Sequence, residues 1–150
     1  MSTGLFLGPQ SIKTSEDETE EFQLPVSDIS STLQKEGLYA PGTLFNIELK
    51  TEHPLTLGMQ ETAKVFSRGR PVFYTSIPYF DMDRRVIAKF PPDKVLASGY
   101  AKQNELLEEK SAMVWVKKGK GQLVLYGFYP QFRASTSGTY KLLFNALFLN

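Results

Sequence analysis

The closing segment of the chain, Gly127 to Asn150, constrains the fold more than any other stretch. Its sequence, GFYPQFRASTSGTYKLLFNALFLN, predicts a strand that runs through a turn into an amphipathic helix. We expect the helix to begin near Thr136 or Ser137. Offsets of three, four and seven predict a core-facing stripe, namely Tyr140, Leu143, Phe144 and Leu147. A strand whose following helix packs back onto the sheet is typical of an α/β layer.

Length and charge limit the possible classes of protein. With 150 residues, of which 41% are hydrophobic and 13% aromatic, the chain can bury one core, and we expect a single domain over residues 1–150. Seventeen basic and sixteen acidic residues give a net charge of +1, so nothing electrostatic favours a nucleic-acid partner. No apolar run approaches the length of a membrane span, and the first residues lack the features of a signal peptide.

The chain contains no cysteine and one histidine, His53. This composition excludes disulfides, thiolate zinc sites and a cysteine nucleophile, and one histidine cannot form a two-histidine zinc site. We therefore predict no metal site and no cofactor in this chain. His53 is interpreted as a structural residue at the end of a strand rather than as a ligand.

Several runs predict β-strands. Thr43 to Lys50 alternates apolar and polar residues, as expected for a strand with one buried face. Ala112 to Val116 and Gln122 to Phe128 flank a turn that contains two glycines, and they predict a hairpin. Pro71 to Phe80 and Arg84 to Phe90 predict a second hairpin.

The rest of the chain gives weaker signals. Gly4 to Gly8 is apolar enough for a buried strand, and Ser15 to Gln23 predicts a short surface helix with acidic residues in its first turn. Ser27 to Pro41 is interpreted as a loop or a covering excursion. Val95 to Tyr100 is a short apolar piece, and Asn104 to Lys110 suits one helical turn or a loop.

Two charged groups have a chemical and a structural interpretation. Asp81 and Asp83 could act as an acid/base couple, but between two strands and next to arginines they favour a solvated turn. Lys117, Lys118 and Lys120 could bind phosphate, but a phosphate-binding loop leads into a helix, whereas this segment leads into a strand. We interpret the three lysines as the tip of a hairpin.

Arg133 is the strongest candidate for ligand binding. It follows a predicted central strand and precedes a helix start, and crevices at the carboxyl ends of α/β strands commonly bind ligands. Ser135 and Thr136 add hydroxyl groups beside it. In the structural alternative, Arg133 pairs with a carboxylate or caps carbonyls while Thr136 or Ser137 caps the helix.

Four segments together support a resemblance to a known family: YAPGTLFNIEL, EHPLTLGM, VLASGY and GKGQLVLYGFYPQFRASTSGTYKLLFNAL, which lie between Tyr39 and Leu147. In this order they resemble the class I glutamine amidotransferase-like domain found C-terminal to bacterial carboxypeptidase-A-type zinc metallopeptidases. In active amidotransferases the last segment reads Gly-x-x-x-His-Pro-Glu. Here Tyr129 stands at the histidine position and Gln131 at the glutamate position, and Pro9 lies in the region of the cysteine nucleophile. The resemblance thus implies a degenerate triad and no catalytic residue.

The resemblance also implies a fold and a partner. The fold would be α/β and flavodoxin-like or glutamine amidotransferase-like, with a mixed, largely parallel sheet flanked by helices. The strand-helix units that usually come first are absent. The chain is then either truncated in its N-terminal half or a reduced domain whose sheet edge is covered by another protein or copy. The zinc, its ligands and the catalytic glutamate would belong to a separate N-terminal peptidase domain.

These observations predict a non-catalytic accessory or interaction domain of a zinc carboxypeptidase-like protein. Such a domain would be periplasmic or extracellular if the parent peptidase is exported. The alternative is a free-standing module that binds a small anionic ligand or a sugar in the crevice near Arg133. A third interpretation, a hydrolase that uses Ser135 or Tyr129, would need a base that the sequence does not reveal.

Overall fold

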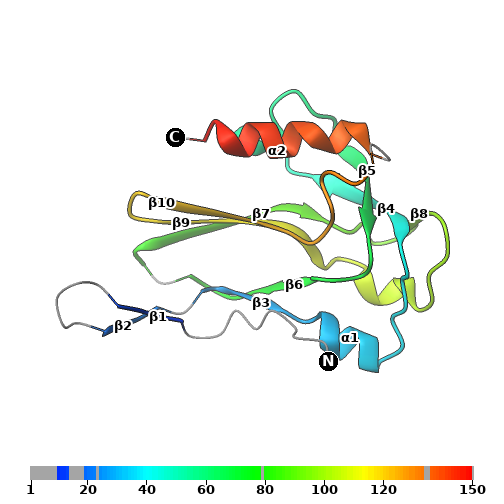
Figure 1. Ribbon diagram of the computed structural model, residues 1–150, viewed down its shortest axis with the longest axis horizontal. Coiled ribbons are helices and arrows are strands. Elements are labelled where there is room, and N and C mark those ends of the chain that lie inside the picture. The colour runs from blue at the N-terminus through cyan, green and yellow to red at the C-terminus, as the bar shows by residue number, and fades with distance from the viewer. Residues whose placement is uncertain (1–9, 14–18, 23, 79, 134–135, 150) are drawn as a thin grey trace.

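The computed structural model describes residues 10–13, 19–22, 24–78, 80–133 and 136–149. Within these ranges the chain forms a curled sheet of eight strands, a separate two-stranded sheet and two short α-helices (Figure 1). The two-stranded sheet consists of β1 (Gln10–Lys13) and β2 (Thr19–Phe22). Helix α2 lies along one side of the large sheet, and α1 lies near its opposite side.

The large sheet has the order β3-β6-β9-β7-β4-β5, with β10 also paired to β9 and β8 also paired to β4. Every strand pair described is antiparallel. The strands are β3 (Val26–Asp28), β4 (Thr43–Leu49), β5 (Thr62–Ser67), β6 (Phe73–Thr75), β7 (Met82–Lys89), β8 (Leu96–Ser98), β9 (Ser111–Lys118) and β10 (Gly121–Tyr126).

The expected α/β fold with a largely parallel, flavodoxin-like sheet is therefore wrong. A parallel pair of strands needs a crossover connection of about a dozen residues or more, usually a helix. In this chain β4 and β5 pair directly with each other, and so do β9 and β10. The closing segment, Gly127 to Asn150, predicts a strand and a helix, but β10 ends at Tyr126 and is followed by an isolated bridge between Tyr129 and Phe66. A single helix on an antiparallel sheet accounts for the pattern that suggested an α/β layer.

Two strand predictions are confirmed. In β4 the side chains of Phe45, Ile47 and Leu49 are buried, as the alternating pattern predicts. Strands β9 and β10 form the expected hairpin, and Gly119 in its turn has a φ of +56°, in the left-handed region that glycine adopts easily.

Strand β9 is buried on both faces because it separates two apolar clusters. Met113 and Trp115 belong to the main core, whereas Val114 and Val116 face a smaller cluster with Val26. Side chains alternate between the two faces of a strand, so successive residues from Met113 to Val116 enter different clusters. This explains why Ala112 to Val116 is an unbroken run of buried residues.

The sheet nearly closes on itself after β10. The backbone N–H of Gly127 donates to the carbonyl of Ala112 on β9, at 2.7 Å. Two residues later the N–H of Tyr129 donates to the carbonyl of Phe66 on β5, at 2.9 Å. Residues 127–129 therefore connect β9 to β5, which is the last strand on the other side of the sheet.

Three other sequence predictions are wrong. Pro71 to Phe80 and Arg84 to Phe90 do not form a hairpin, because β6 pairs with β3 and β9 while β7 pairs with β4 and β9. Ser27 to Pro41 contains part of β3 and the helix α1 (Ser30–Lys35) rather than only a loop. In the segment expected to be a helix, Thr19–Phe22 is the strand β2.

Other expectations have mixed outcomes. Asn104–Leu107 forms a single 3-10 turn, η2, as expected, and Val95 to Tyr100 contains β8. Gly4 to Gly8 and the beginning of the expected acidic helix lie outside the described residues.

Helix α2 (Tyr140–Leu147) follows the 3-10 turn η3 (Ser137–Thr139), so a helix is present where the closing segment predicts one. Its buried residue, however, is Leu142, and the predicted core-facing stripe is wrong. Phe144 is 56% exposed and Leu147 is 72% exposed. The apolar residues that pack toward the main core are instead Leu142, Ala146 and Leu149.

Polar contacts fix α2 in this orientation over the 3-10 turn η1 (Pro54–Thr56). The amide nitrogen of Asn145 donates to the carbonyls of Leu55 at 2.9 Å and of Leu57 at 3.2 Å. The Tyr126 hydroxyl of β10 donates to the carbonyl of Leu142 at 3.0 Å, and burial raises the pKa of Tyr126 to about 12. These contacts turn the other apolar face of α2 outward.

Candidate functional site

Of the predicted triad positions that the structure describes, Tyr129 takes part in the closure of the sheet. Tyr129 makes the backbone bridge to Phe66, and its ring lies 5.9 Å from the Phe66 ring. Phe132 stacks on the same Phe66 ring at 4.2 Å with an interplanar angle of 1°. Gln131 is exposed, and Pro9 lies outside the described residues. Tyr129 therefore has a packing role in this structure.

A buried threonine holds the turn that follows. The Thr139 hydroxyl lies 2.7 Å from the carbonyl oxygens of Pro130 and Thr136, both of which can accept its proton. The Thr136 hydroxyl is 3.1 Å from the Thr139 hydroxyl. Thr136 thus points its polar group at Thr139, and it makes no side-chain cap bond at the start of η3.

Arg133 is exposed and lies over an aromatic ring. Its guanidinium carbon is 5.6 Å from the centre of the Phe132 ring, and its φ is +46°. The crevice expected at the carboxyl ends of parallel strands has no counterpart, because the described sheet is antiparallel. Ser135 lies outside the described residues, so the expected grouping of Arg133, Ser135 and Thr136 stays a prediction.

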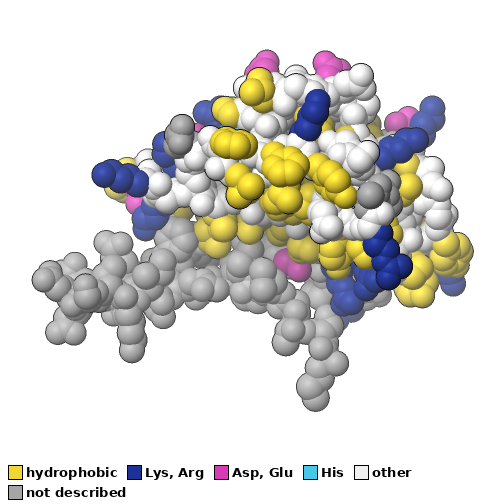
Figure 2. Space-filling model, turned by 45° about the horizontal axis from the view of Figure 1, so that its top comes forward, with side chains coloured by type: hydrophobic (Ala, Val, Ile, Leu, Met, Phe, Trp, Pro, Cys, Tyr) yellow, Lys and Arg dark blue, Asp and Glu magenta, His cyan; other side chains and the backbone are white. Residues whose placement is uncertain are grey.

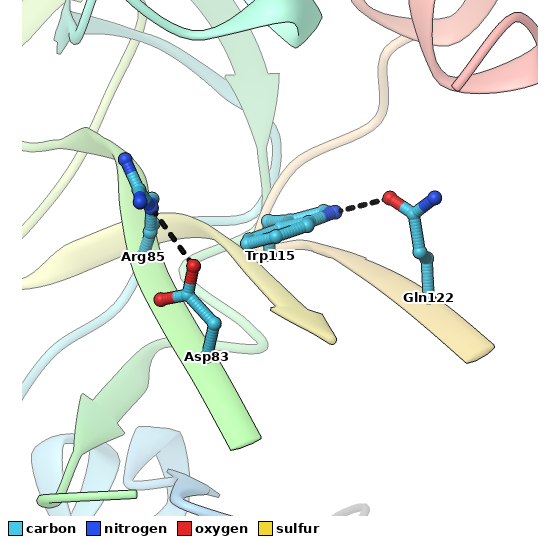
Figure 3. A network of polar contacts seen from close by, with 4 residues as sticks. All are labelled: Asp83, Arg85, Trp115 and Gln122. Carbon is cyan, nitrogen blue, oxygen red and sulfur yellow. Dashed lines mark hydrogen bonds and ion pairs between the residues drawn. The ribbon is translucent and has the colours of Figure 1, made fainter. Parts of the chain in front are cut away.

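Two polar pairs lie on neighbouring strands, one within β7 and the other between β9 and β10 (Figure 3). Arg85 pairs with Asp83 at 3.2 Å, and the indole N–H of Trp115 donates to Gln122 Oε1 at 2.9 Å. The His53 ring lies 5.1 Å from the Trp115 ring, at an interplanar angle of 60°. The sequence does not indicate that these residues lie close together, because they come from four separate elements.

The environment of His53 favours its neutral form. Burial lowers the pKa of His53 below its ordinary value of 6.5, and the nearby charge of Arg85 lowers the pKa further, while Asp83 partly opposes both. Its Nδ1 accepts a hydrogen bond from the backbone N–H of Leu55 at 3.2 Å. His53 therefore caps the start of η1 at the end of the β4 segment, as a structural histidine would.

The two aspartates do not face each other as an acid/base couple would. Asp83 pairs with Arg85, whereas Asp81 lies 3.8 Å from the ammonium group of Lys118. Both aspartates are exposed, and Asp83 lies within β7 rather than in a turn. Within the described ranges, no group of three or more His, Asp or Glu side chains is placed to hold a metal ion.

The outward face of α2 carries several exposed apolar side chains. We define the outer stripe as four exposed side chains on α2 and the adjacent turn: Leu57, Phe144, Leu147 and Phe148. Their exposed fractions lie between 56% and 80%. Figure 2 displays apolar side chains gathered on the face of the molecule that carries α2.

The sequence indicates that the last helix has exposed apolar residues, but the helical spacing alone does not show which apolar face is buried. In the run from Leu142 to Leu149 only Asn145 is polar, so any helical arrangement leaves apolar residues on two faces.

No helix in the described part of the chain is long and apolar enough to cross a membrane. Comparison with known proteins finds no matching family model and no matching curated protein.

Proposed function

We propose that this chain is a non-catalytic interaction module that docks through the outer stripe of α2 onto a folded partner domain. The observation that carries the proposal is that α2 has apolar residues on both faces. One face packs on the sheet through Leu142, and the other face presents Phe144, Leu147 and Phe148 to solvent. A group of exposed apolar side chains of this kind commonly marks a site of protein–protein interaction.

The energetic argument for docking follows from the exposed area. Complete burial of a Leu or Phe side chain contributes about 1.5–3 kcal/mol. Phe144 is 56% exposed, Leu147 72% and Phe148 80%, so burying what remains exposed would contribute about 1–2 kcal/mol for each side chain. Lys141 is the only charged residue of α2, and its ammonium group already donates to the carbonyl of Gly58 at 2.9 Å. A patch with so few charges suits the apolar centre of an interface.

The partner we propose is the peptidase domain of a zinc carboxypeptidase-like protein. This part of the proposal rests on the sequence resemblance between Tyr39 and Leu147, not on the fold, because the sheet differs from the one that the resemblance implies. The packing roles of Tyr129 and His53 favour an interaction module over an enzyme.

The experiment is a binding titration between this chain and a purified carboxypeptidase-A-type zinc metallopeptidase domain. We expect saturable binding that Phe144→Asp and Leu147→Asp each weaken by at least about tenfold, because each places a charge in an apolar interface. Leu123→Asp, an exposed leucine on β10 outside the outer stripe, is the matched control and should bind normally. Equal affinities for all three variants would refute docking through α2, and glutaminase activity in the purified chain would refute the non-catalytic role.

A further inference from the structure

A cleft of about 530 Å³ lies between the residues that follow α1 and the residues that follow β5. Such a volume lies within the range of small-molecule sites, about 300–1,000 Å³. The side chains that matter for its chemistry come from both walls: Gln34, Tyr39, Arg68 and Arg70. This cleft is separate from the outer stripe and does not include Arg133.

The wall with the two arginines is held in place by a buried hydroxyl group. Ser67 is fully buried, its Oγ accepts from the N–H of Gly69 at 3.1 Å, and its hydroxyl donates to the carbonyl of Gly127 at 3.0 Å. Gly69 has a φ of +68°, and a Cβ built on it would lie 3.3 Å from Leu38 Cδ2. The turn therefore packs directly against the opposite wall, and the backbone that carries both arginines is fixed.

The opposite wall is equally anchored to the sheet. Asp28 at the end of β3 accepts from the N–H of Ser30 at 2.8 Å and from the N–H of Val72 at 3.1 Å, which ties α1 to the segment after Arg70. The backbone of Tyr39 exchanges two hydrogen bonds with Lys102, at 3.1 and 2.8 Å. A site fixed before binding loses less conformational entropy when a ligand enters.

The two arginines are positioned for an anion. Arg68 and Arg70 flank Gly69, both line the cleft and both are exposed. No carboxylate of the described residues forms an ion pair with either guanidinium. Two cations that pair with no described carboxylate attract an oxyanion, and guanidinium groups bind carboxylate and phosphate through paired hydrogen bonds.

The remaining lining residues indicate what the oxyanion is attached to. The Tyr39 side chain is 54% exposed, and its ring contacts the Tyr100 ring edge to face at 6.4 Å, which leaves ring surface for a planar group. Gln34 offers an amide that both donates and accepts hydrogen bonds. We propose that this cleft binds a small ligand that carries a phosphate or carboxylate group next to an aromatic or other planar group.

The test measures binding of four probes to the intact chain by calorimetry: phenyl phosphate, benzoate, inorganic phosphate and phenol. We expect phenyl phosphate or benzoate to bind more tightly than inorganic phosphate, and phenol to bind weakest. The stronger of the first two identifies the oxyanion. Affinity should fall as the salt concentration rises, because salt screens exposed charges.

Variants assign the binding to the cleft. Arg68→Gln combined with Arg70→Gln should weaken the best probe by at least about tenfold, since charge-assisted hydrogen bonds are lost. Tyr39→Ala should bring its affinity down to that of inorganic phosphate. Lys117→Gln combined with Lys120→Gln removes the same charge from the exposed β9–β10 hairpin, at the other end of the molecule in Figure 1, and should bind normally.

Three results would overturn the proposal: no saturable binding of any probe up to about 10 mM, equal losses in the two double variants, or binding of phenol as tight as that of phenyl phosphate. Unfolding of the arginine variant is checked by circular dichroism. Changes in the amide chemical shifts of the unmodified chain on addition of the best probe locate the binding site without any variant. Shifts should concentrate at Gln34, Gly37 and Tyr39, and shifts elsewhere alone would contradict the cleft.

Discussion

Replacing Gly127 by alanine should strongly destabilise the chain, because residue 127 lies where the sheet closes. A Cβ at this position would lie 2.8 Å from two backbone carbonyl oxygens, those of Ala112 and Pro71. Neither oxygen can move without shifting a neighbouring segment. The shift would also strain the hydrogen bond from the Gly127 N–H to Ala112, at 2.7 Å, and the one from Ser67 to the Gly127 carbonyl, at 3.0 Å.

The expected loss can be estimated from these contacts. Overpacking in a close-packed region costs about 1–3 kcal/mol, and a weakened hydrogen bond costs about 1 kcal/mol. We therefore expect Gly127→Ala to lower the free energy of unfolding by about 3 kcal/mol. In a domain of this size, such a loss lowers the melting temperature by about 10 °C.

Urea denaturation of three glycine variants provides the assay and its controls. Gly138→Ala has no atom within 4 Å of the new Cβ and should leave stability unchanged or slightly higher. Gly119→Ala also has open space, but its φ of +56° should cost about 1–2 kcal/mol. If Gly127→Ala were no less stable than Gly138→Ala, the closure of the sheet through residues 127–129 would be refuted.

Three further predictions concern single side chains. Ser67→Ala removes a buried hydroxyl that serves two backbone groups, and urea denaturation should reveal a loss of about 2 kcal/mol, whereas exposed Ser98→Ala should be neutral. His53 has a folded-state pKa below its ordinary value of 6.5, so the unfolded chain binds more protons as the pH falls. The free energy of unfolding should therefore fall between about pH 7 and 5, and it should fall more in the unmodified chain than in His53→Asn. The asparagine keeps a side-chain acceptor for the N–H of Leu55. Parallel pH curves for the two proteins would contradict the lowered pKa of His53. If Arg133 binds a small anion or sugar, a ligand panel should raise the melting temperature of the unmodified chain but not of Arg133→Ala, and equal shifts would exclude that site.

The strands that the sequence predicts well are defined by neighbouring residues. Alternation within Thr43–Leu49 identifies β4 and its buried face without reference to any other segment. The β9–β10 hairpin follows from two apolar runs and the Gly119 turn. In both cases the interactions that decide the structure lie within about ten residues, so a local pattern contains the information.

The predictions that fail depend on contacts between distant residues. Asn145 hydrogen-bonds to Leu55, 90 positions away, and this contact decides which apolar face of α2 is buried. Ser67 and Gly127, 60 positions apart, meet where the sheet closes. Thr19–Phe22 follows an acidic run that suits a helix start, yet it pairs with Gln10–Lys13 as a strand. Periodicity cannot report such pairings, and the expected parallel α/β sheet followed instead from the closing strand-helix pattern and from the family resemblance.

The candidate sites follow the same division. The prediction of a ligand site at Arg133 depends on its position after a strand. Such a position indicates a ligand site only at the carboxyl ends of parallel strands. Arg68 and Arg70 gave no motif, because their cleft exists only once Gly69 packs against Leu38. The sequence predicts two residues of the outer stripe, Phe144 and Leu147, to face the core, whereas in the structure both are exposed.

The proposal that this chain is an interaction module is tested most directly by hydrogen exchange of α2 with and without the carboxypeptidase-type domain. Docking through the outer stripe should slow exchange of the α2 amides and of the η1 turn, while amides in the β9–β10 turn around Gly119 exchange at an unchanged rate. Phe144→Asp should abolish the protection of α2. Binding of the peptidase domain without any slowing in α2, or no binding at all, would contradict the proposal.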